Sequence, residues 1–333
     1  MILSSANVMV TGGAGFIGSE LVRELLRKRA NVVVYDNFSS GDVSNLKEIE
    51  DSIEIVQGDI LDTKFEKVLD ENNIELVFHL AAEPFIPYCY YRPRRFFEVN
   101  ANGTLKVLLD CKKAGVERLL YYSTSEVYGT AKYIPMNEDH PTHPLSTYAA
   151  SKLAADRLCF TLHKEQNIPV IILRQFNVYG PRETQPYVIP EIISQMSRTN
   201  RLKLGNIKAR RDFTYVGDTA ECAVSLMKCD EAVGEVFNVG YGANYSIEEI
   251  SHIIADLMNI TDMGITVEPN RLRPLDVEAL LCDSSKAYGF IKWKPKTDFR
   301  MGLKQTIEWF KEHDCKWIWE TKISSEDRLW RSR

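Results

Sequence analysis

The sequence predicts an α/β protein with a doubly wound parallel sheet, followed by a smaller mixed α/β region. Short β-branched runs alternate with amphipathic helical stretches through the first half, and a glycine-rich turn follows the first of these runs. The alternation weakens beyond about residue 181. Strands that are separated by helices need crossover connections and lie parallel in one sheet. The length of 333 residues suits one large α/β unit or two coupled domains.

The expected elements follow from the spacing of the apolar residues. Apolar, β-branched runs predict strands at residues 7–11, 31–35, 53–57, 76–80, 119–123 and 170–173. Apolar residues at helical spacing predict helices at residues 16–29, 95–114 and 147–164. In the second half, the same criteria predict a strand at residues 236–239 and helices at residues 188–196, 218–227, 247–258 and 301–313.

These elements divide the chain unevenly. We expect residues 1–180 to form the first domain, with segments around 212–240 returning to it, and residues 181–313 to form most of the second. Residues 314–333 form a tail that carries three tryptophans among charged residues, namely Trp317, Trp319 and Trp330. Such a tail can dock as an ordered end, form a subunit contact or pack loosely on its own chain.

The composition argues against several classes of function. The net charge is -5 and the 41 lysines and arginines are scattered, so neither a nucleic acid nor an anionic membrane is an expected partner. No apolar run reaches the roughly 18 residues of a membrane span, and the N-terminus lacks the pattern of a signal peptide. The seven cysteines contain no CxxC pair, which argues against a disulfide framework or a zinc site. We expect a reduced, cytoplasmic, metal-free protein.

The glycine-rich turn has the features of a dinucleotide-binding loop. Residues 11–18 read TGGAGFIG, and Gly12, Gly15 and Gly18 have the GxxGxxG spacing between a strand and a helix. The missing side chains allow a tight turn, a close approach of the backbone to a pyrophosphate and close packing of the helix on the strand. The N-terminus of the helix then offers free N–H groups to the anion. By itself the pattern also suits a purely structural turn.

Two acidic residues extend this site. Asp36 follows the second expected strand, where its carboxylate can accept hydrogen bonds from the adenosine ribose and would repel a 2′-phosphate. This position favours NAD over NADP. Asp59, in Gly58-Asp59-Ile60 after the third expected strand, lies where an adenine contact would fall, and the N-cap of a helix is the alternative. Together with the glycine loop, these residues predict an NAD site.

A tyrosine and a lysine one helical turn apart form the candidate catalytic pair. The segment Tyr148-Ala-Ala-Ser-Lys152 places both side chains on one face of an expected helix. A free phenol has a pKa of about 10 and is a poor base at neutral pH. A nearby ammonium stabilises the phenolate, and the positive charge of a bound nicotinamide would add to that effect. Alone, such a pair is typical of an exposed surface, but the dinucleotide loop and Ser123-Thr124 upstream favour catalysis.

The ordered set of motifs resembles the extended short-chain dehydrogenase/reductase family, in particular its nucleotide-sugar epimerase/dehydratase branch. The resemblance spans residues 7–313. It rests on TGGAGFIG (11–18), YDN (35–37), HLAA (79–82), STSEVYG (123–129), YAASK (148–152), FNVYGPR (176–182), RDFTYVGD (211–218), FNVG (237–240) and RLRP (271–274). The resemblance implies a Rossmann-type NAD-binding domain and a smaller substrate domain, with the site in the cleft between them.

The resemblance also implies roles for individual residues. Tyr148 would take the proton of the sugar 4-hydroxyl while a hydride leaves C4 for NAD, Lys152 would hold the nicotinamide ribose and lower the pKa of the phenol, and Thr124 would hydrogen-bond O4. The predicted cofactor-binding residues are Gly12, Gly15, Phe16, Ile17, Gly18, Asp36, Asn37, Asp59, Ile60, Leu80, Ala81, Ala82, Asn100, Ser123, Tyr148 and Lys152.

A second group of residues is expected to bind the nucleotide sugar. By resemblance, Asn177 would contact the diphosphate and Arg211 and Arg273 would pair with its oxygens, since a guanidinium is planar and permanently charged. Ion pairs within the chain are the alternative for both arginines. The segment 84–95 would overhang the sugar. The further predicted contacts are Glu83, Pro84, Tyr88, Val188, Ile189 and Leu204, with ordinary loop or helix packing as the alternative.

Glu126 narrows the expected reaction. Simple 4-epimerases of this family usually carry a small or apolar residue at its position in STSEVYG, whereas a carboxylate resembles the 4,6-dehydratases. Once C4 is a ketone the C5 proton is acidic, and a carboxylate can remove it as a general base before water leaves from C6. The preceding residue is Ser125, where dTDP-glucose dehydratases have Asp, so Glu126 becomes the candidate to shuttle the proton to the leaving hydroxyl. A surface carboxylate at a strand end is the structural alternative.

The leading prediction is therefore an NAD-dependent UDP-sugar 4,6-dehydratase. The segments 86–91, 204–206 and 280–286 look most like the UDP-N-acetylglucosamine 4,6-dehydratases of legionaminic-acid-type pathways. A UDP-glucuronate-type decarboxylase is second because it shares Thr-Ser-Glu, and a 4-epimerase is third. A catalytically silent NAD-binding module is the non-enzymatic alternative. The family also implies a homodimer that pairs the helices near residues 95–114 and 147–166.

Overall fold

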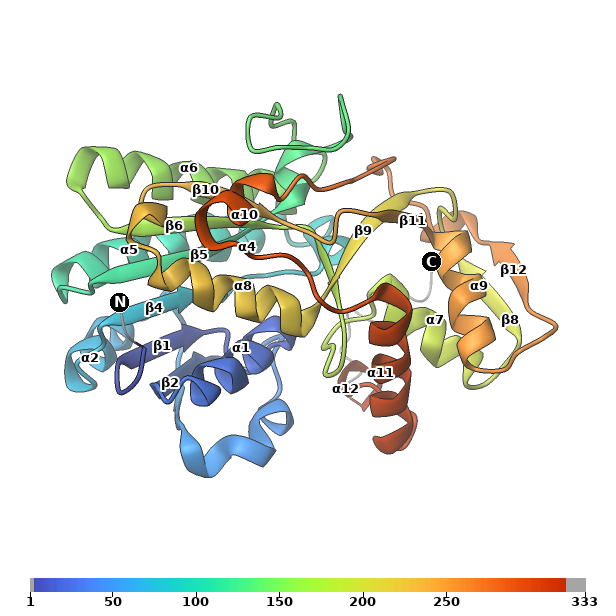
Figure 1. Ribbon diagram of the computed structural model, residues 1–333, viewed down its shortest axis with the longest axis horizontal. Coiled ribbons are helices and arrows are strands. Elements are labelled where there is room, and N and C mark those ends of the chain that lie inside the picture. The colour runs from blue at the N-terminus through green and yellow to red at the C-terminus, as the bar shows by residue number, and fades with distance from the viewer. Residues whose placement is uncertain (1–2, 322–333) are drawn as a thin grey trace.

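The computed structural model describes residues 3–321, and a seven-stranded sheet forms its centre (Figure 1). The strands lie in the order β10-β6-β5-β4-β1-β2-β3, and neighbours pair in parallel. Their bounds are Asn7–Thr11 (β1), Asn31–Asp36 (β2), Glu54–Gln57 (β3), Leu76–His79 (β4), Arg118–Thr124 (β5), Val170–Gln175 (β6) and Val236–Val239 (β10). The predicted α/β class and parallel sheet are confirmed.

The direction in which the strands are added reverses at β1. The chain proceeds from β1 to β2 and β3 on one side, then crosses to β4 on the other side and continues to β5 and β6. In open α/β sheets, ligands bind outside the carboxyl ends of the strands at such a reversal. The fold therefore brings the residues that follow Thr11, Asp36, His79 and Thr124 to one edge of the sheet.

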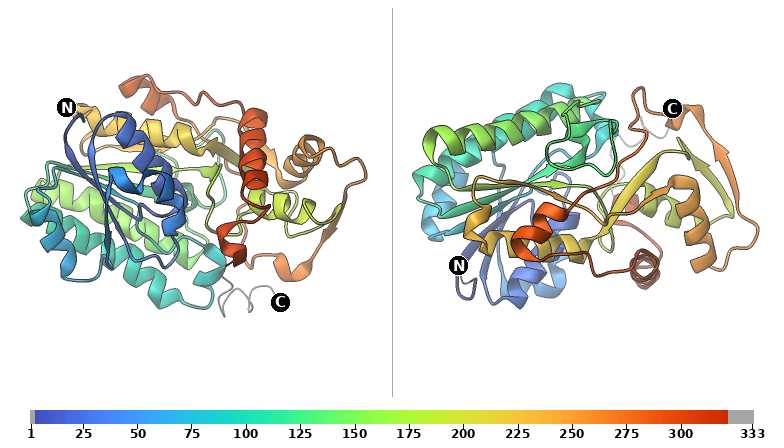
Figure 2. Two further views of the ribbon diagram at one scale, coloured as in Figure 1. Left: turned by 90° about the horizontal axis from the view of Figure 1, so that it is seen from below. Right: turned by 45° about the horizontal axis from the view of Figure 1, so that its top comes forward.

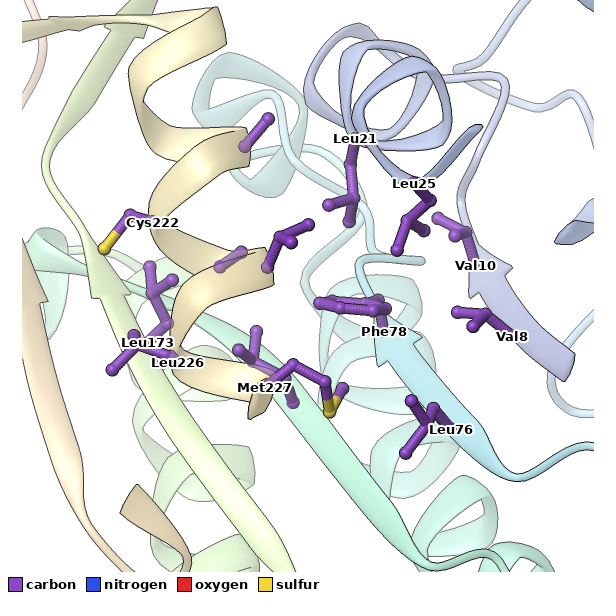
Figure 3. Packing of buried hydrophobic residues seen from close by; sticks show 14 of the residues in the cluster. Val8, Val10, Leu21, Leu25, Leu76, Phe78, Leu173, Cys222, Leu226 and Met227 are labelled. Carbon is purple, nitrogen blue, oxygen red and sulfur yellow. The ribbon is translucent and has the colours of Figure 1, made fainter. Parts of the chain in front are cut away.

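Helices cover both faces of this sheet (Figures 1 and 2). The first face carries α1 (Phe16–Arg27), α8 (Val216–Lys228) and α10 (Ser285–Ile291), and the second carries α2 (Lys64–Glu71), α5 (Thr104–Lys113) and α6 (Thr147–Gln166). On the first face, Leu21 and Leu25 of α1 and Met227 of α8 pack in one buried cluster with Val10 and Phe78 of the sheet (Figure 3). Burial of this apolar surface on both faces stabilises the sheet and fixes its edge.

A smaller mixed region follows the sheet along the chain. Strands β7 (Asn177–Tyr179), β9 (Arg210–Tyr215) and β11 (Asn244–Ser246) form one sheet, and β8 (Arg201–Leu204) pairs with β12 (Gly264–Val267). Residues of helices α7 (Val188–Met196), α9 (Ile247–Leu257) and α11 (Phe299–Glu312) share a separate apolar core with these strands. The domain boundaries proposed above stay a prediction.

The first part of the tail packs on its own chain. Trp317 and Trp319 are buried in the core of the mixed region, and Trp319 belongs to α12 (Ile318–Thr321), which ends the described residues. The Trp317 indole nitrogen donates to the Pro190 carbonyl at 3.0 Å. Trp330 lies outside the described residues. No helix among residues 3–321 is long and apolar enough to cross a membrane.

Several elements differ from the expected ones. The helix expected at residues 95–114 is formed by α4 (Pro93–Phe97), a π-helical segment (Glu98–Gly103) and α5 in succession. The first helix ends at Arg27 rather than at residue 29, because Arg29 has a φ of 62°. The strands of the mixed region were not predicted, because they are short and pair with distant segments rather than showing a regular alternation.

Candidate active site

A cavity of about 460 Å³ opens at the carboxyl edge of the seven-stranded sheet. The ends of β1, β2, β4 and β5 line one part of it, and residues of β7, α7, β8 and β9 line the other. Every residue predicted for the site contributes to its wall except Tyr88, Asn100 and Ile189. The fold thus gathers segments from Gly12 to Arg273 around one space.

The glycine loop presents backbone to the cavity. Gly12 has a φ of 71°, and a Cβ on it would lie 2.8 Å from the Ala81 nitrogen. A Cβ on Gly18 would lie 2.2 Å from the Gly12 carbonyl oxygen, so glycine is needed for α1 to pack this close to the loop. The N-cap of α1 is Gly15 and no side chain caps the helix. Its first N–H groups can therefore bind an anion, which fits the pyrophosphate of a dinucleotide.

Asp36 lies at the end of β2 beside this loop. Its Oδ2 accepts a hydrogen bond from the Ala14 nitrogen at 2.9 Å, and its Oδ1 accepts one from the Phe38 nitrogen at 2.8 Å. Burial raises the pKa of Asp36. The two bonds fix the carboxylate against the loop, and its remaining lone pairs can accept hydrogen bonds from ribose hydroxyls.

Asp59 is held by three hydrogen bonds. Its Oδ1 accepts from the Leu61 nitrogen at 3.0 Å, and its Oδ2 accepts from Asn37 Nδ2 at 3.0 Å and from Arg95 Nη2 at 3.2 Å. Burial opposes ionisation, but these bonds lower the pKa of Asp59. Helix α2 begins at Lys64 with Thr63 as its N-cap, so Asp59 is not the cap of that helix. The alternative prediction, that Asp59 is the N-cap of a helix, was wrong.

The candidate reaction centre lies where β5 faces the first turn of α6. β5 ends at Thr124, and the Thr124 Oγ1 accepts a hydrogen bond from the Glu126 nitrogen at 3.2 Å in the following 3₁₀ turn, Ser125–Tyr128. Burial raises the pKa of Tyr148, a hydrogen bond with the Thr124 side chain opposes this rise, and the charge of Glu126 adds to it. Thr124, Glu126 and Tyr148 thus lie within interaction range on the cavity wall.

Lys152 lies one helical turn after Tyr148. Its Nζ donates to the Tyr122 carbonyl at 2.6 Å and lies 4.3 Å from the centre of the Tyr121 ring. Burial lowers the pKa of Lys152 to about 7. In this geometry the ammonium is not among the groups that shift the pKa of the Tyr148 phenol. The predicted lowering of that pKa by Lys152 stays a prediction for the cofactor-bound protein.

A buried ion pair behind the reaction centre was missed by the sequence analysis. Asp156 is fully buried, and its Oδ2 accepts from Ser123 Oγ and from Arg174 Nε, both at 2.9 Å. Arg174 Nη2 also donates to Asp156 Oδ1 at 3.0 Å, which makes the pair bidentate. The pair ties α6 to β5 and β6 and so fixes Lys152 relative to Ser123. The four-residue spacing from Lys152 to Asp156 on one helix face was the available signal.

The arginines of the mixed region are paired with acidic residues. Arg211 Nη2 lies 3.2 Å from Asp276 Oδ1, and Arg273 Nη1 lies 3.9 Å from the same oxygen. Arg271 Nη1 lies 3.0 Å from Glu191 Oε1. Arg211 and Arg273 thus form ion pairs within the chain, which the sequence analysis gave as the alternative to binding the diphosphate. Neither acidic residue was predicted: Glu191 lies 80 positions from Arg271, and Asp276 lies 65 positions from Arg211, although only three from Arg273.

Arg211 also connects this group to the reaction centre. Burial lowers the pKa of Arg211, while the charges of Glu126 and Asp276 raise it. The carboxylate of Glu126 therefore acts on both Tyr148 and Arg211. The reaction centre and the arginine group are neighbours across the cavity.

Asn177 has an unsatisfied polar atom. Its Oδ1 is buried and has no hydrogen-bond partner in the structure, although the residue lines the cavity. Buried polar atoms are rarely left without a partner, so an orphan on a cavity wall is a good position for a ligand contact. Because this atom is an acceptor, a ligand would have to offer it an N–H or O–H group.

Three predicted residues lie outside the cavity wall. Tyr88 packs edge-on against Phe85 with ring centroids 5.0 Å apart. Ile189 is buried in the core of the mixed region, as its helix-packing alternative predicted. Asn100 is buried and hydrogen-bonds the backbone of Glu83. Asn100 thus does not line the cavity itself but holds the backbone of Glu83, which does.

Comparisons with known proteins identify similar chains. A sequence model described as GDP-mannose 4,6 dehydratase matches residues 9–306. The human (Homo sapiens) dTDP-D-glucose 4,6-dehydratase is 31% identical over 321 residues, covering 93% of this chain and 91% of that protein. The UDP-N-acetyl-alpha-D-glucosaminuronate decarboxylase of Bacillus cytotoxicus is 34% identical over 318 residues, covering 91% of this chain and 97% of that protein.

A solved structure agrees over nearly the same length. It is DesIV, a dTDP-glucose 4,6-dehydratase of Streptomyces venezuelae, with NAD and TYD bound. The TM-score is 0.87 at 28% sequence identity, and the match covers 93% of this chain and 98% of that one. The predicted fold class is thus supported by an experimental structure as well as by the topology of the sheet.

Proposed function

The chain belongs to the GDP-mannose 4,6 dehydratase family, and we propose that it is an NAD-dependent 4,6-dehydratase of UDP-N-acetylglucosamine. One observation carries this proposal. Glu126 lines the same cavity as Thr124 and Tyr148, and its charge acts on the Tyr148 phenol. A carboxylate beside the base that takes the proton of the 4-hydroxyl can serve an elimination, whereas a simple epimerase has no use for it.

The first step is oxidation at C4. NAD, which the glycine loop and Asp36 would hold, would supply the hydride acceptor at C4 and, later, the hydride donor at C6. The Tyr148 phenolate takes the proton of the 4-hydroxyl as the ketone forms. The hydrogen bond with Thr124 favours the phenolate against the burial that opposes it.

The second step is elimination. The C4 ketone acidifies the C5 proton, which Glu126 removes as a general base. Glu126 then gives this proton to the C6 hydroxyl, which leaves as water, because Ser125 beside it is not an acid of comparable strength. After the hydride returns to C6, a proton from solvent completes C5, and the Tyr148 phenol releases the proton that it took from the 4-hydroxyl to solvent. Atoms and charges balance, and the net change is the loss of one water.

The ion pairs of the cavity favour dehydration over decarboxylation. A decarboxylase must hold the C6 carboxylate of its substrate with a cation. Among the described residues that line the cavity, each cationic side chain already has a partner in the chain, namely Arg95, Lys152, Arg211, Arg271 and Arg273. The diphosphate shared by all these substrates already has to displace Asp276 from Arg211 and Arg273, and a C6 carboxylate would have to displace a further partner.

The decarboxylase remains the second candidate for a specific reason. The Bacillus cytotoxicus relative has a higher identity than the human dehydratase, 34% against 31%. The Thr124-Ser125-Glu126 motif also suits both reactions, because each begins with oxidation at C4. A 4-epimerase is third, since epimerisation at C4 does not need Glu126 as a base.

The choice of sugar and the assembly are part of the same proposal. The segments that resemble UDP-N-acetylglucosamine dehydratases include residues 86–87 and 204–206, all of which line the cavity. We propose a homodimer through α4, α5 and α6, which expose three large apolar side chains, Phe97, Leu109 and Phe160, with exposed fractions of 46%, 42% and 37%. The cytoplasmic location stays a prediction.

Product mass tests the proposed reaction. The purified protein is incubated separately with UDP-N-acetylglucosamine, UDP-glucuronate and UDP-glucose, and each product is measured by mass spectrometry. We expect UDP-N-acetylglucosamine to lose the mass of one water. Loss of carbon dioxide from UDP-glucuronate, or an unchanged mass with an inverted C4, would overturn the dehydratase assignment in favour of the second or third candidate.

A further inference from the structure

One arginine links two carboxylates on the wall of the cavity. Arg95 Nη2 donates to Asp59 Oδ2 and Arg95 Nε donates to Glu83 Oε1, both at 3.2 Å. All three residues line the cavity, and the exposed fractions of their side chains are 33% for Arg95, 23% for Asp59 and 15% for Glu83. The guanidinium suits this bridge because its N–H groups point in several fixed directions at once.

The first carboxylate belongs to the adenosine end. Asp59 also accepts a hydrogen bond from Asn37, which directly follows Asp36 at the end of β2. The Asp59 backbone carbonyl accepts a further bond from the Tyr35 hydroxyl at 3.1 Å. Asp59 is thus anchored to the strand whose carboxylate faces the glycine loop.

The second carboxylate belongs to the reaction end. The Asn100 side chain holds the backbone of Glu83, accepting from its nitrogen at 2.8 Å and donating to its carbonyl at 3.2 Å. Asn100 Nδ2 also donates to Ser151 Oγ at 3.0 Å, and that hydroxyl donates to the Tyr148 carbonyl at 2.8 Å. Glu83 is thereby fixed relative to the helix that carries the catalytic phenol.

We propose that Arg95 is a positioning residue shared by both ligands of the cavity: it holds Asp59 for the cofactor and Glu83 for the sugar. This inference rests on the proposed function. Both ligands carry negatively charged diphosphates. Without Arg95, two carboxylates on the cavity wall would lose their shared counter-charge beside ligands of the same sign, while Asn37 and Leu61 would still hold Asp59.

The direct test is Arg95→Met in the full-length protein. We expect the Kd for NAD, measured by calorimetric titration of protein freed of nucleotide, to rise about threefold to tenfold. The KM for UDP-N-acetylglucosamine should rise by a similar factor, while kcat changes less than about twofold, because Arg95 does not touch the reacting atoms. Arg95→Lys should restore part of either the affinity for NAD or the KM for the sugar, but not both. A single ammonium is a poor bridge between two carboxylates.

A matched control removes the neighbouring charge. Arg94 is exposed and precedes Arg95 in α4. Arg94→Met changes the net charge by the same amount, and we expect it to leave both constants unchanged. Equal effects of the two substitutions would reduce the role of Arg95 to general electrostatics and would overturn the proposal.

Double substitutions separate the two halves of the bridge. Asp59→Asn should couple with Arg95→Met in the Kd for NAD, so that the double variant is affected less than the product of the single effects. Glu83→Gln should couple with Arg95→Met in the KM for the sugar in the same way. The crossed pairs should be independent. A purely structural role of Arg95 would instead lower the melting temperature and couple equally with both partners.

The outcomes distinguish this inference from the proposed function. If the wild-type protein turns over no UDP-sugar, the proposed function fails, but the titrations with NAD still report on Arg95 and Asp59. If the wild-type protein is active and Arg95→Met leaves the Kd for NAD and the KM for the sugar unchanged, the inference about Arg95 fails on its own.

Discussion

At the proposed cofactor end of the cavity, backbone N–H groups and the carboxylate of Asp36 lie at the wall, whereas the proposed substrate end carries arginines that are already paired with acidic side chains. The cofactor end is fixed by covalent geometry and close packing around Gly12 and Gly18. The substrate end is fixed by ion pairs between distant segments, as in the pair of Arg211 and Asp276.

This difference indicates how each end responds to a ligand. A rigid backbone surface binds a pyrophosphate without rearranging, so little free energy is lost to ordering. A diphosphate that enters the substrate end must instead compete with Asp276 for Arg211, and the pairs must exchange partners. We therefore expect the cofactor end to be sensitive to added volume and the substrate end to be sensitive to removed charge.

The largest expected effect is that of added volume at the cofactor end. In Gly18→Ala, the new Cβ would meet the Gly12 carbonyl, since the distance would be 2.2 Å. We expect the free energy of unfolding to fall by about 1–3 kcal/mol and the affinity for NAD to fall by at least about tenfold. Denaturant unfolding and NAD titration measure the two effects.

The control for this substitution is Gly289→Ala. Gly289 lies inside α10, and a Cβ on it would meet nothing within 4 Å. Alanine is favoured over glycine within a helix by about 0.5–1 kcal/mol, so this variant should be as stable as the wild type or slightly more stable. If Gly18→Ala behaved in the same way, the cofactor end would not depend on close packing.

A smaller effect is expected from removed charge at the substrate end. The Arg211 side chain is only 8% exposed, whereas that of Arg271 is 31% exposed. We expect Arg211→Met to raise the KM for the nucleotide sugar by about tenfold or more, because buried charged hydrogen bonds are strong. Arg271→Met should raise it by less than about threefold, because partly exposed ion pairs contribute little.

Steady-state kinetics measure both KM values, and the Kd for NAD serves as the internal control. It should stay at the wild-type value in both variants, since neither arginine belongs to the glycine loop. A loss of NAD affinity as large as the rise in KM would show that the two ends do not act independently.

The same difference explains what the sequence could and could not predict. The cofactor end depends on short-range patterns, such as the glycine spacing after β1 and the acidic residue at the end of β2, so its residues could be proposed from the sequence, and all of them except Asn100 line the cavity. The YxxxK spacing placed Tyr148 and Lys152 on one helix for the same reason.

The substrate end could not be predicted in this way. Arg211 and Arg273 were identified by resemblance, whereas Arg271 was given no role, and the pairs of Arg211 with Asp276 and of Arg271 with Glu191 become visible only when the chain is folded. The bridge of Arg95 also joins residues that lie 36 and 12 positions away from it, Asp59 and Glu83. Contacts between distant segments are set by tertiary packing and leave no local pattern in the sequence.

The most direct measurement of the central claim, that Glu126 removes the C5 proton, is the reaction in heavy water. With UDP-N-acetylglucosamine, the wild-type product should lack one water and carry a deuterium from the solvent at C5. Glu126→Gln should form no dehydrated product and should leave C5 with its original hydrogen. Dehydration by Glu126→Gln at the wild-type rate would contradict the account.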